Sequence, residues 1–305
     1  MQDERKRTKV PHLTSSICTN KKVKNKKPKI KMTDQEFCVV TRKKWLARKS
    51  LNKKQPVYRT SSENVLPEVD VPKFLTRLQR VREKMESSDY FQTSLTTLNE
   101  SLQEFGNTKI TKLVCFGIGP FTRSIQALHQ FGFILELQKN LQIKDALFFD
   151  PVFRESEKEV LKTLECSLMK ENCEAKFASD VCTLFYLPHC PNSLTNNLLW
   201  KNWLPDKLSQ VVLINNSFES LTSSFPDSVL RKDSGYILDV KPFVKEYSLD
   251  DCYEVHNIFN DLSVHVFPRS ILPEESSEFW TVKEAPKYEK GEMVTTIEFD
   301  KLAIS

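Results

Sequence analysis

Two glycines, Gly117 and Gly119, stand where a short apolar run (residues 113–116) gives way to a segment with helical periodicity. Glycine has no Cβ, so the backbone there can turn sharply and approach a ligand closely. Thr122 or Ser124 can cap the helix that follows, and the loop would then offer free backbone N–H groups to a phosphate or carboxylate. The dinucleotide-binding fingerprint has a third glycine where this chain has Thr122. Anion binding and plain turn chemistry therefore both remain open.

An acid, Asp150, follows a second short apolar run, residues 146–149. In doubly wound folds an acid at the end of the second strand commonly holds a ribose hydroxyl. Asp150 lies 31 positions after Gly119, farther than the usual spacing of about 20, and a longer helix would accommodate the surplus. With Pro151 it could instead cap the next helix, predicted around residues 160–168. Ligand contact and capping are equally compatible with the sequence.

A His-Cys pair, His189 and Cys190, lies between two prolines after a predicted strand at residues 183–187. Imidazole could activate the thiolate as a nucleophile, or both groups could meet a metal. Cys190 followed by proline is also a weak haem-responsive pattern, with the thiolate as iron ligand. Adjacent residues of an extended chain point in opposite directions, and no oxyanion loop or third partner is evident. A structural loop is the competing interpretation.

Two amides, Asn215 and Asn216, follow the clearest remaining strand, residues 210–214. They could hydrogen-bond a polar ligand or form an Asx turn. The carboxyl ends of parallel strands meet at one edge of a sheet, where doubly wound folds bind their ligands. We therefore expect the glycine turn, Asp150 and the His-Cys pair to gather along a common rim.

The elements that would position these residues alternate between strand and helix. Amphipathic helices are predicted at residues 71–85 and 91–105, and a helix at 121–141. Further strands are predicted at 173–177, 236–238 and 264–267, with a helix at 248–262. This alternation predicts an α/β fold, a Rossmann-like, doubly wound and mostly parallel sheet with an N-terminal helical segment. Residues 66–305 would form this domain, with a helical lead-in at 70–106, a sheet core at 110–270 and a C-terminal extension at 271–305, including elements near Trp280 and residues 294–299.

Charge divides the 305-residue chain into a basic arm and an acidic body. Residues 1–60 hold 19 Lys and Arg against 4 Asp and Glu, whereas residues 61–305 hold 26 against 36. Runs of like charge with few apolar residues bury too little to offset chain entropy, so residues 1–65 are expected to be disordered. A lysine run in the arm is a candidate nuclear-import signal, with a solvated tail as the alternative: Lys21, Lys22, Lys24, Lys26, Lys27, Lys29 and Lys31. Sequence-specific nucleic-acid reading is not expected, because no stacking aromatics are interleaved.

The cysteine pattern and the hydropathy of the sequence indicate the kind of cellular compartment in which the protein is expected. The chain has eight Cys, no Cys-x-x-Cys spacing, no signal peptide and no run of eighteen apolar residues. These features predict a reducing compartment, free thiols, no membrane span and no zinc site.

Taken together, the motifs resemble those of the sensitivity-to-red-light-reduced (SRR-like) family, and its animal branch in particular, over residues 70–270. They are Val114-Cys-Phe-Gly-Ile-Gly-Pro120 with Ser124 and Gln126, Phe149-Asp150-Pro151, Tyr186-Leu-Pro-His-Cys190 and Leu213-Ile-Asn-Asn-Ser217. The resemblance implies a regulator of circadian-clock gene expression and of haem biosynthesis, located in the cytoplasm and also in the nucleus. It carries over Gly117, Gly119, Ser124, Gln126, Asp150, Pro151, Pro188, His189 and Cys190 as recurrent residues without catalytic roles.

Two functions from different classes then compete. The first is a non-enzymatic regulator whose domain docks proteins or senses a small ligand, with a nucleotide or haem as candidates. The second is an adenosine-cofactor-dependent, methyltransferase-like enzyme, because a Gly-x-Gly loop and an acid after the second strand hold such cofactors. A base or nucleophile with an orienting partner would favour the enzyme, and only His189 and Cys190 are candidates. The sequence therefore favours the regulator.

Overall fold

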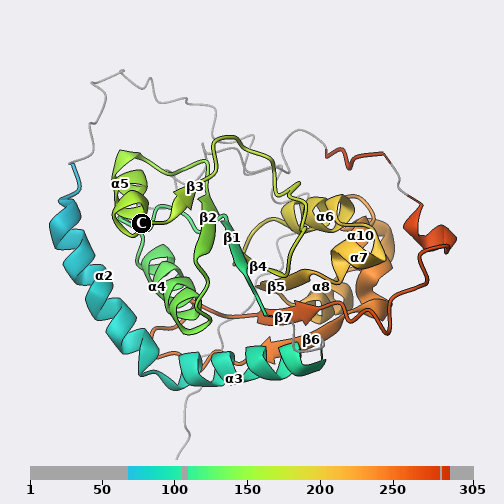
Figure 1. Ribbon diagram of the computed structural model, residues 1–305, viewed down its shortest axis with the longest axis horizontal. Coiled ribbons are helices and arrows are strands. Elements are labelled where there is room, and N and C mark those ends of the chain that lie inside the picture. Colours follow the sequence, from blue (N-terminus) through green and yellow to red (C-terminus); the bar gives the residue numbers. More distant parts are fainter. Residues whose placement is uncertain (1–67, 105–108, 282–283, 289–305) are drawn as a thin grey trace, which may run out of the picture. The chain divides into compact units, whose positions relative to one another are not determined.

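The computed structural model describes residues 68–104, 109–281 and 284–288 (Figure 1). The basic arm predicted at residues 1–65, with its import lysines, lies outside the described residues, as do the elements predicted at 294–299.

Two helices precede the sheet, as predicted. They are α2 (Val71–Glu86) and α3 (Asp89–Glu104). Asp70 caps α2, since its side chain accepts from the backbone N–H of Lys73 at 3.0 Å. The chain turns at Ser87 and Ser88, where both hydroxyls bond back to carbonyls of the last turn of α2. The apolar stripe of α2 packs along α4 (Ile125–Asn140).

Seven strands form one sheet in the order β3-β2-β1-β4-β5-β7-β6. The first five strands in this order pair in parallel, and β7 is antiparallel to both β5 and β6. The strands are β1 (Lys112–Phe116), β2 (Asp145–Phe149), β3 (Ser167–Leu168), β4 (Thr183–Leu187), β5 (Val211–Asn216), β6 (Lys245–Leu249) and β7 (Leu262–Val266). The order reverses between β1 and β4, so the predicted doubly wound, mostly parallel sheet is confirmed.

Alternate side chains of each strand enter two different cores. Leu113 and Cys115 of β1 lie in one core, and Val114 and Phe116 lie in the other. Helices cover both faces of the sheet, and Figure 1 shows α4 and α5 on one side of it and α6 and α10 on the other. The helices after β1 are α4 (Ile125–Asn140), α5 (Glu155–Thr163), α6 (Asn192–Lys201), α7 (Pro205–Leu208), α8 (Phe218–Ser224), α9 (Asp227–Leu230) and α10 (Gly235–Val240), with short 3-10 turns at η1 (Lys241–Phe243) and η2 (Glu278–Trp280).

The prediction of a strand at residues 173–177 is wrong. Glu174 and Ala175 both have positive φ, which bends the chain into a turn, and Phe177 donates its N–H to the carbonyl of Ala175. The third strand is instead the two-residue β3, which pairs with β2. The apolar side chains of Cys173, Ala175 and Phe177 pack in the second core, although the segment does not pair with a strand.

Two predictions in the C-terminal half are also wrong. Residues 236–238 belong to α10, where Tyr236, Ile237 and Val240 are buried at helical spacing. Residues 248–262 are not a helix, because β6 runs to Leu249 and an irregular loop leads to β7. Asn257 in this loop has a positive φ, which breaks a right-handed helix.

Candidate functional site

The polar residues that follow β1, β2, β4 and β5 gather at one edge of the sheet, because these four strands are neighbours and parallel. The backbone N–H of Gly119 lies 2.7 Å from the carboxylate of Asp150. The sulfur of Cys190 lies 3.5 Å from the carbonyl oxygen of Phe116. The structure therefore places the glycine turn, the acid and the His-Cys loop along one rim.

The carboxylate of Asp150 closes the glycine loop. One oxygen accepts from the N–H of Gly119, and the other accepts from the N–H of Val152 at 2.9 Å. Burial raises the pKa of Asp150, and these two backbone hydrogen bonds partly oppose it. Asp150 does not cap α5, whose N-cap is Arg154. The acid thus uses the loop amide that an anionic ligand would need.

A second acid, Glu157 on α5, holds the other end of the same loop. It is fully buried, and it accepts from the N–H of Thr122 at 3.3 Å, from the Thr122 hydroxyl, and from the N–H of Arg154 at 3.0 Å. Sequence reasoning missed Glu157 because the N-cap residue, Arg154, has no side-chain acceptor, so the Ser or Thr of a capping box is absent from the sequence. With two carboxylates against the loop, a phosphate would meet occupied donors and negative charge.

One of the two residues predicted to cap the helix after the glycine loop, Ser124, does so. The side chain of Ser124 accepts from the N–H of Ala127 at 3.3 Å, so Ser124 is the N-cap of α4. Gln126 in the first turn is exposed. The predicted cap is therefore in place, but it serves α4 itself.

Cys190 packs on Gly117 at the point where the strand order reverses. Gly117 has a φ of +68°, and a Cβ added there would lie 2.3 Å from the sulfur of Cys190. Part of Cys190 is exposed, but burial of its sulfur and the nearby charge of Asp150 raise the pKa of the thiol. The protonated thiol faces the Phe116 carbonyl, whereas an iron ligand or nucleophile must be a thiolate. A haem iron would have to displace this contact and deprotonate the thiol, as metal ions do on coordination.

Both ring nitrogens of His189 have partners. Nε2 lies 3.1 Å from the carbonyl oxygen of Ile258, which can only accept, so Nε2 carries the proton. Nδ1 then accepts from the side-chain amide of Asn216 at 3.3 Å, while Oδ1 of that amide accepts from the backbone N–H of His189 at 2.8 Å. Asn216 also donates to Asp261 at 3.3 Å. This network holds one tautomer and points neither nitrogen at Cys190.

A pocket of about 350 Å³ opens beside this network, over the ends of β4 and β5. Asn215 is among the lining residues, contacts Thr195 of α6 and is 3% exposed. Its Nδ2 donates to the hydroxyl of Thr195 at 2.7 Å, but its Oδ1 has no hydrogen-bond partner among the described residues. The lining residues comprise His189, Cys190, Asn192, Asn215, Asn216, Ser217, Phe218, Ser220, Leu221, Ser224, Phe225, Ile237 and Asp261. Sequence reasoning missed Asn192, Asp261 and the α8 residues that line the pocket. Asp261 precedes the antiparallel β7, whereas α8 begins two residues after β5, and this position after a parallel strand could have indicated it.

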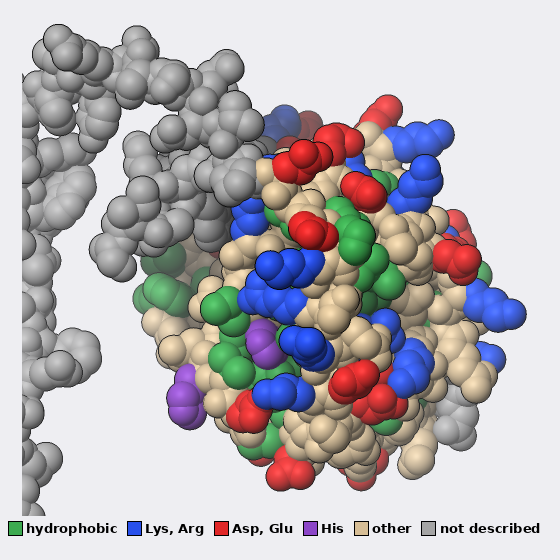
Figure 2. Space-filling model, turned by 90° about the vertical axis from the view of Figure 1, so that its left-hand side faces the viewer, with side chains coloured by type: hydrophobic (Ala, Val, Ile, Leu, Met, Phe, Trp, Pro, Cys, Tyr) green, Lys and Arg blue, Asp and Glu red, His purple; other side chains and the backbone are tan. Residues whose placement is uncertain are grey.

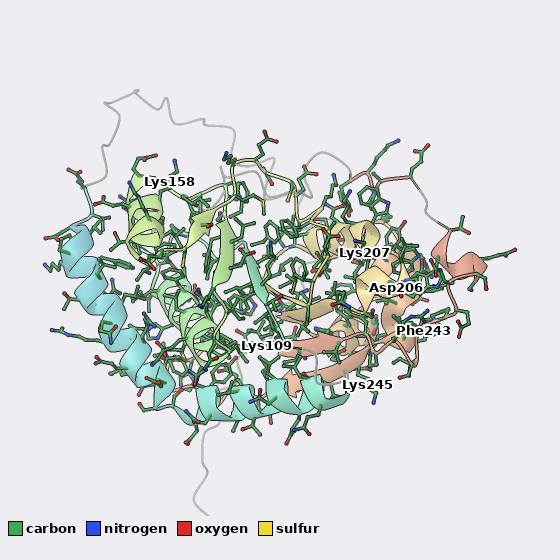
Figure 3. The ribbon with its side chains drawn as sticks, in the orientation of Figure 1. Lys109, Lys158, Asp206, Lys207, Phe243 and Lys245 are labelled. Atoms are coloured by element: carbon green, nitrogen blue, oxygen red, sulfur yellow. The ribbon has the colours of Figure 1, made fainter. Side chains whose placement is uncertain are left out.

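A second hollow, of about 500 Å³, lies at the opposite edge, by the amino-terminal ends of β1, β4 and β5. Lys109, Asp206 and Lys207, which Figure 3 labels, belong to its lining. Lys207 forms an ion pair with Asp180 in the same lining. Ligands of doubly wound folds bind at the carboxyl ends of the strands, so the β4–β5 pocket is the better candidate site.

The described residues contain no group of three or more His, Cys, Asp and Glu side chains placed to hold a metal ion. In the same part of the chain, no helix has the length and apolar character needed to span a membrane.

Comparison with known proteins agrees with the resemblance inferred from the motifs. The model of the SRR1 domain family matches residues 81–266. An SRR1-like protein of Drosophila melanogaster is 40% identical over 273 residues, covering 88% of this chain and 96% of the relative. An SRR1-like protein of Mus musculus is 30% identical over 57% of this chain and 83% of the relative, and the Arabidopsis thaliana protein SENSITIVITY TO RED LIGHT REDUCED 1 is 29% identical over 62% and 72%. The chain therefore belongs to the SRR1 domain family.

Proposed function

We propose that this chain is a regulatory protein that acts by binding rather than by catalysis, in circadian-clock gene expression and in the control of haem biosynthesis. Family membership supports the proposal, and the plant relative is named for its effect on sensitivity to red light. Light response and clock control are linked regulatory processes rather than chemical reactions. The proposal thus places the domain in regulation.

One observation carries the non-catalytic part of the proposal: every candidate reactive group at the rim is engaged by the protein itself. Asp150 binds two backbone amides, the Cys190 thiol faces a backbone carbonyl, and both nitrogens of His189 are hydrogen-bonded. A general base needs a nitrogen or oxygen within reach of the substrate proton. These residues instead hold the loops in place, which suits a binding domain.

The experiment that tests this proposal replaces His189, whose imidazole lies at the rim. Asn tolerates the left-handed backbone that His189 adopts, so His189→Asn removes a base without backbone strain. In cells whose gene for this protein has been deleted, expression of wild type or of His189→Asn should restore both the amplitude of a clock-gene reporter and the total haem content. The empty vector should restore neither. If the variant folds as wild type does but fails to rescue, His189 acts chemically and the proposal is wrong.

A methyltransferase-like enzyme is the second candidate, and the strand order favours it. The order β3-β2-β1-β4-β5-β7-β6 with β7 reversed is also the order of adenosylmethionine-dependent methyltransferases, an analogy at the level of fold. Such a cofactor would have to displace Asp150 from Gly119 to reach the loop. Calorimetry with adenosylmethionine tests this candidate: we expect no binding heat, and micromolar binding would favour the enzyme over the regulator.

A basic helix face supports the proposal that the protein binds acidic protein partners. Lys73, Arg77, Arg80 and Lys84 are exposed along α2. Figure 2 views the molecule from the α2 side and shows Lys and Arg side chains gathered there. Charge complementarity of this kind directs association and sets its salt dependence. Arg77→Glu with Arg80→Glu should therefore weaken capture of acidic partners, without changing the unfolding midpoint.

The proposed location is the cytoplasm, with entry to the nucleus through the lysine run at residues 21–31. Import signals of this kind are short basic segments. A fluorescent fusion whose seven lysines of this run are changed to Gln should lose its nuclear share. Equal nuclear fluorescence in both fusions would exclude the run as the signal.

A further inference from the structure

We infer that the partner bound by α2 is itself a helix, whose Asp and Glu side chains repeat at positions i, i+4, i+7 and i+11 and face a row of cations on α2. The inference rests on the proposed function, which assigns an acidic protein partner to this helix, and it names the shape and the charge pattern of that partner. The row of cations, called the basic stripe below, consists of Lys73, Arg77, Arg80 and Lys84, all exposed.

The basic stripe is straight and narrow. Its members are four, three and four residues apart, and each residue of an α-helix is turned by about 100° from the one before, so all four leave α2 within an arc of about 60°. At a rise of about 1.5 Å per residue, the stripe is about 16 Å long. Glu83, the one acid among the exposed residues of α2, lies about 90° round the helix from the centre of the stripe. The stripe is therefore a single row of positive charge.

Most of this charge has no counter-ion within the described residues. There, the side chains of Lys73, Arg77 and Arg80 form no ion pair, and Lys84 has only a contact of 3.7 Å with the exposed carboxylate of Glu254. Unpaired cations in a row attract a partner of opposite charge and fix its register. The Lys and Arg side chains on this face in Figure 2 are thus available to a partner.

The charge of the basic stripe reaches a buried imidazole on α4. Burial lowers the pKa of His129, and the charges of Arg77 and Lys84 lower it further, whereas that of Glu254 opposes them. His129 is 9% exposed, and its Nδ1 lies 2.7 Å from the hydroxyl of Tyr253. Carboxylates laid on the stripe would offset the charges of Arg77 and Lys84, so the pKa of His129 should rise when a partner binds.

A second helix matches the repeat of the basic stripe. Residues four, three and four apart lie on one side of an α-helix, so acids with this spacing could meet all four cations. The spacing is the same in both directions, so the two middle acids face Arg77 and Arg80 whether the helices run parallel or antiparallel. In an extended segment, acids on one side repeat at about 6.7 Å, so four of them span about 20 Å and overrun the stripe.

Nucleic acid and anionic membrane fit the basic stripe less well. Sites for single-stranded nucleic acid combine basic grooves with aromatic side chains on which bases stack, and no exposed residue of α2 is aromatic. A helix that lies on a membrane buries an apolar face in the lipid, whereas the apolar side of α2 is packed along α4. An acidic helix needs neither feature.

The test compares two labelled peptides on the full chain by fluorescence anisotropy. Both are Ala-rich, long enough to be helical and equal in composition and charge. The patterned peptide has four Glu at i, i+4, i+7 and i+11, and the scrambled peptide has them spread round the helix. We expect the patterned peptide to bind about three- to tenfold more tightly, because the scrambled one presents only some of its acids at once and each exposed charge pair contributes little. Equal affinity would refute the inference.

The imidazole of His129 gives a local measurement, because residues 1–60 are also basic and would add a similar background to both peptides. NMR titration with pH should show a higher pKa for His129 when the patterned peptide is bound. An unchanged pKa at saturation would place the peptide elsewhere on the chain. A single-stranded oligonucleotide that raises this pKa more than the patterned peptide does would make nucleic acid the occupant, and the inference would be wrong.

Two pairs of substitutions separate the basic stripe from net charge. Arg77→Gln with Arg80→Gln should reduce the affinity for the patterned peptide to about that for the scrambled one. Lys201→Gln with Lys232→Gln removes the same charge from exposed positions at the end of α6 and after α9, and should bind as wild type does. Equal losses in both variants would show general attraction and refute the inference.

A charge exchange tests the pairing itself. Arg77→Glu with Arg80→Glu should bind the patterned peptide poorly, and a peptide whose two middle Glu are replaced by Lys should bind this variant more tightly than it binds wild type. Failure of this exchange would mean that the acids do not face Arg77 and Arg80.

The outcome is separable from that of the proposed function. Equal binding of the patterned and scrambled peptides would refute the helical partner and leave regulation through another acidic partner in place. Selective binding of the patterned peptide, together with failure of His189→Asn to rescue, would keep the basic stripe and overturn the non-catalytic role.

Discussion

Replacing Gly117 by Ala tests the close approach of the glycine loop to Cys190. The φ of Gly117 is +68°, a left-handed value that disfavours any residue with a Cβ. The new Cβ would stand 2.3 Å from the sulfur of Cys190, closer than van der Waals contact allows, so the loop or the Cys190 side chain must move. Two independent costs therefore act at one position.

The magnitude follows from these two terms. A left-handed backbone costs an Ala roughly 1–2 kcal/mol relative to Gly. Inserting a methyl group into a packed contact costs about 1–3 kcal/mol. We expect the free energy of unfolding to fall by about 2–5 kcal/mol, which is a large fraction of the stability of a typical domain.

Urea unfolding of the full chain, followed by far-UV circular dichroism, measures this loss. Gly235→Ala is the matched control, because Gly235 lacks a positive φ and an added Cβ there meets no atom within 4 Å. The control should leave the free energy of unfolding unchanged or raise it by about 0.4–1 kcal/mol.

A double-mutant cycle separates the steric term from the backbone term. Cys190→Ala removes the sulfur, so Gly117→Ala in that background should cost only the backbone term of about 1–2 kcal/mol. If Gly117→Ala costs no more than Gly235→Ala, or if its cost is the same with and without the sulfur, the sulfur of Cys190 does not crowd position 117 as described.

Three further predictions concern thiol chemistry, acid stability and a buried ion pair. Because burial raises the pKa of Cys190, the thiol of Cys190 should resist alkylation in the native protein while exposed Cys252 reacts, as mass spectrometry would show. The absorbance spectrum of Cys190→Ala mixed with haem should match that of wild type. Burial alone would raise the pKa of Glu246, but neighbouring donors and charges, chiefly His265, lower it to about 2. A carboxyl whose pKa is lower in the folded state than in the unfolded state stabilises the fold above the unfolded-state pKa, and this contribution is lost as the pH falls through the folded-state pKa. The free energy of unfolding of wild type should therefore exceed that of Glu246→Gln by about 1–3 kcal/mol above about pH 4.5, and the difference should disappear as the pH falls through about 2. Arg82→Ala should lower the free energy of unfolding by about 1.5–3 kcal/mol, because Glu136, which is 2% exposed, loses the guanidinium at 2.6 Å and retains Lys139 at 3.3 Å. A loss below about 1 kcal/mol in urea titration would contradict this.

Local patterns predicted most of the fold because they depend on short windows. The helices α2, α3 and α4 and the strands β1, β2, β4, β5 and β7 all carry periodic or continuous apolar runs bounded by turn residues. The predictions of strands at residues 173–177 and 236–238 are wrong because each segment has three apolar residues, and so short a pattern is compatible with a strand, a helix or a packed turn. At 236–238 the decision came from contact with α6, where Asn196 accepts the N–H of Tyr236 at 2.7 Å.

By itself the sequence determined which residues reach the rim, since parallel strands carry whatever follows them to the same edge of the sheet. It could not show which of those residues remain available to a ligand. Gly117 and Cys190, or Thr122 and Glu157, lie far apart in the chain, and their contacts depend on how whole strands and helices pack. Hydrogen-bond satisfaction is a property of the assembled fold, so only the tertiary structure decided that Asp150 and Glu157 occupy the amides of the glycine loop.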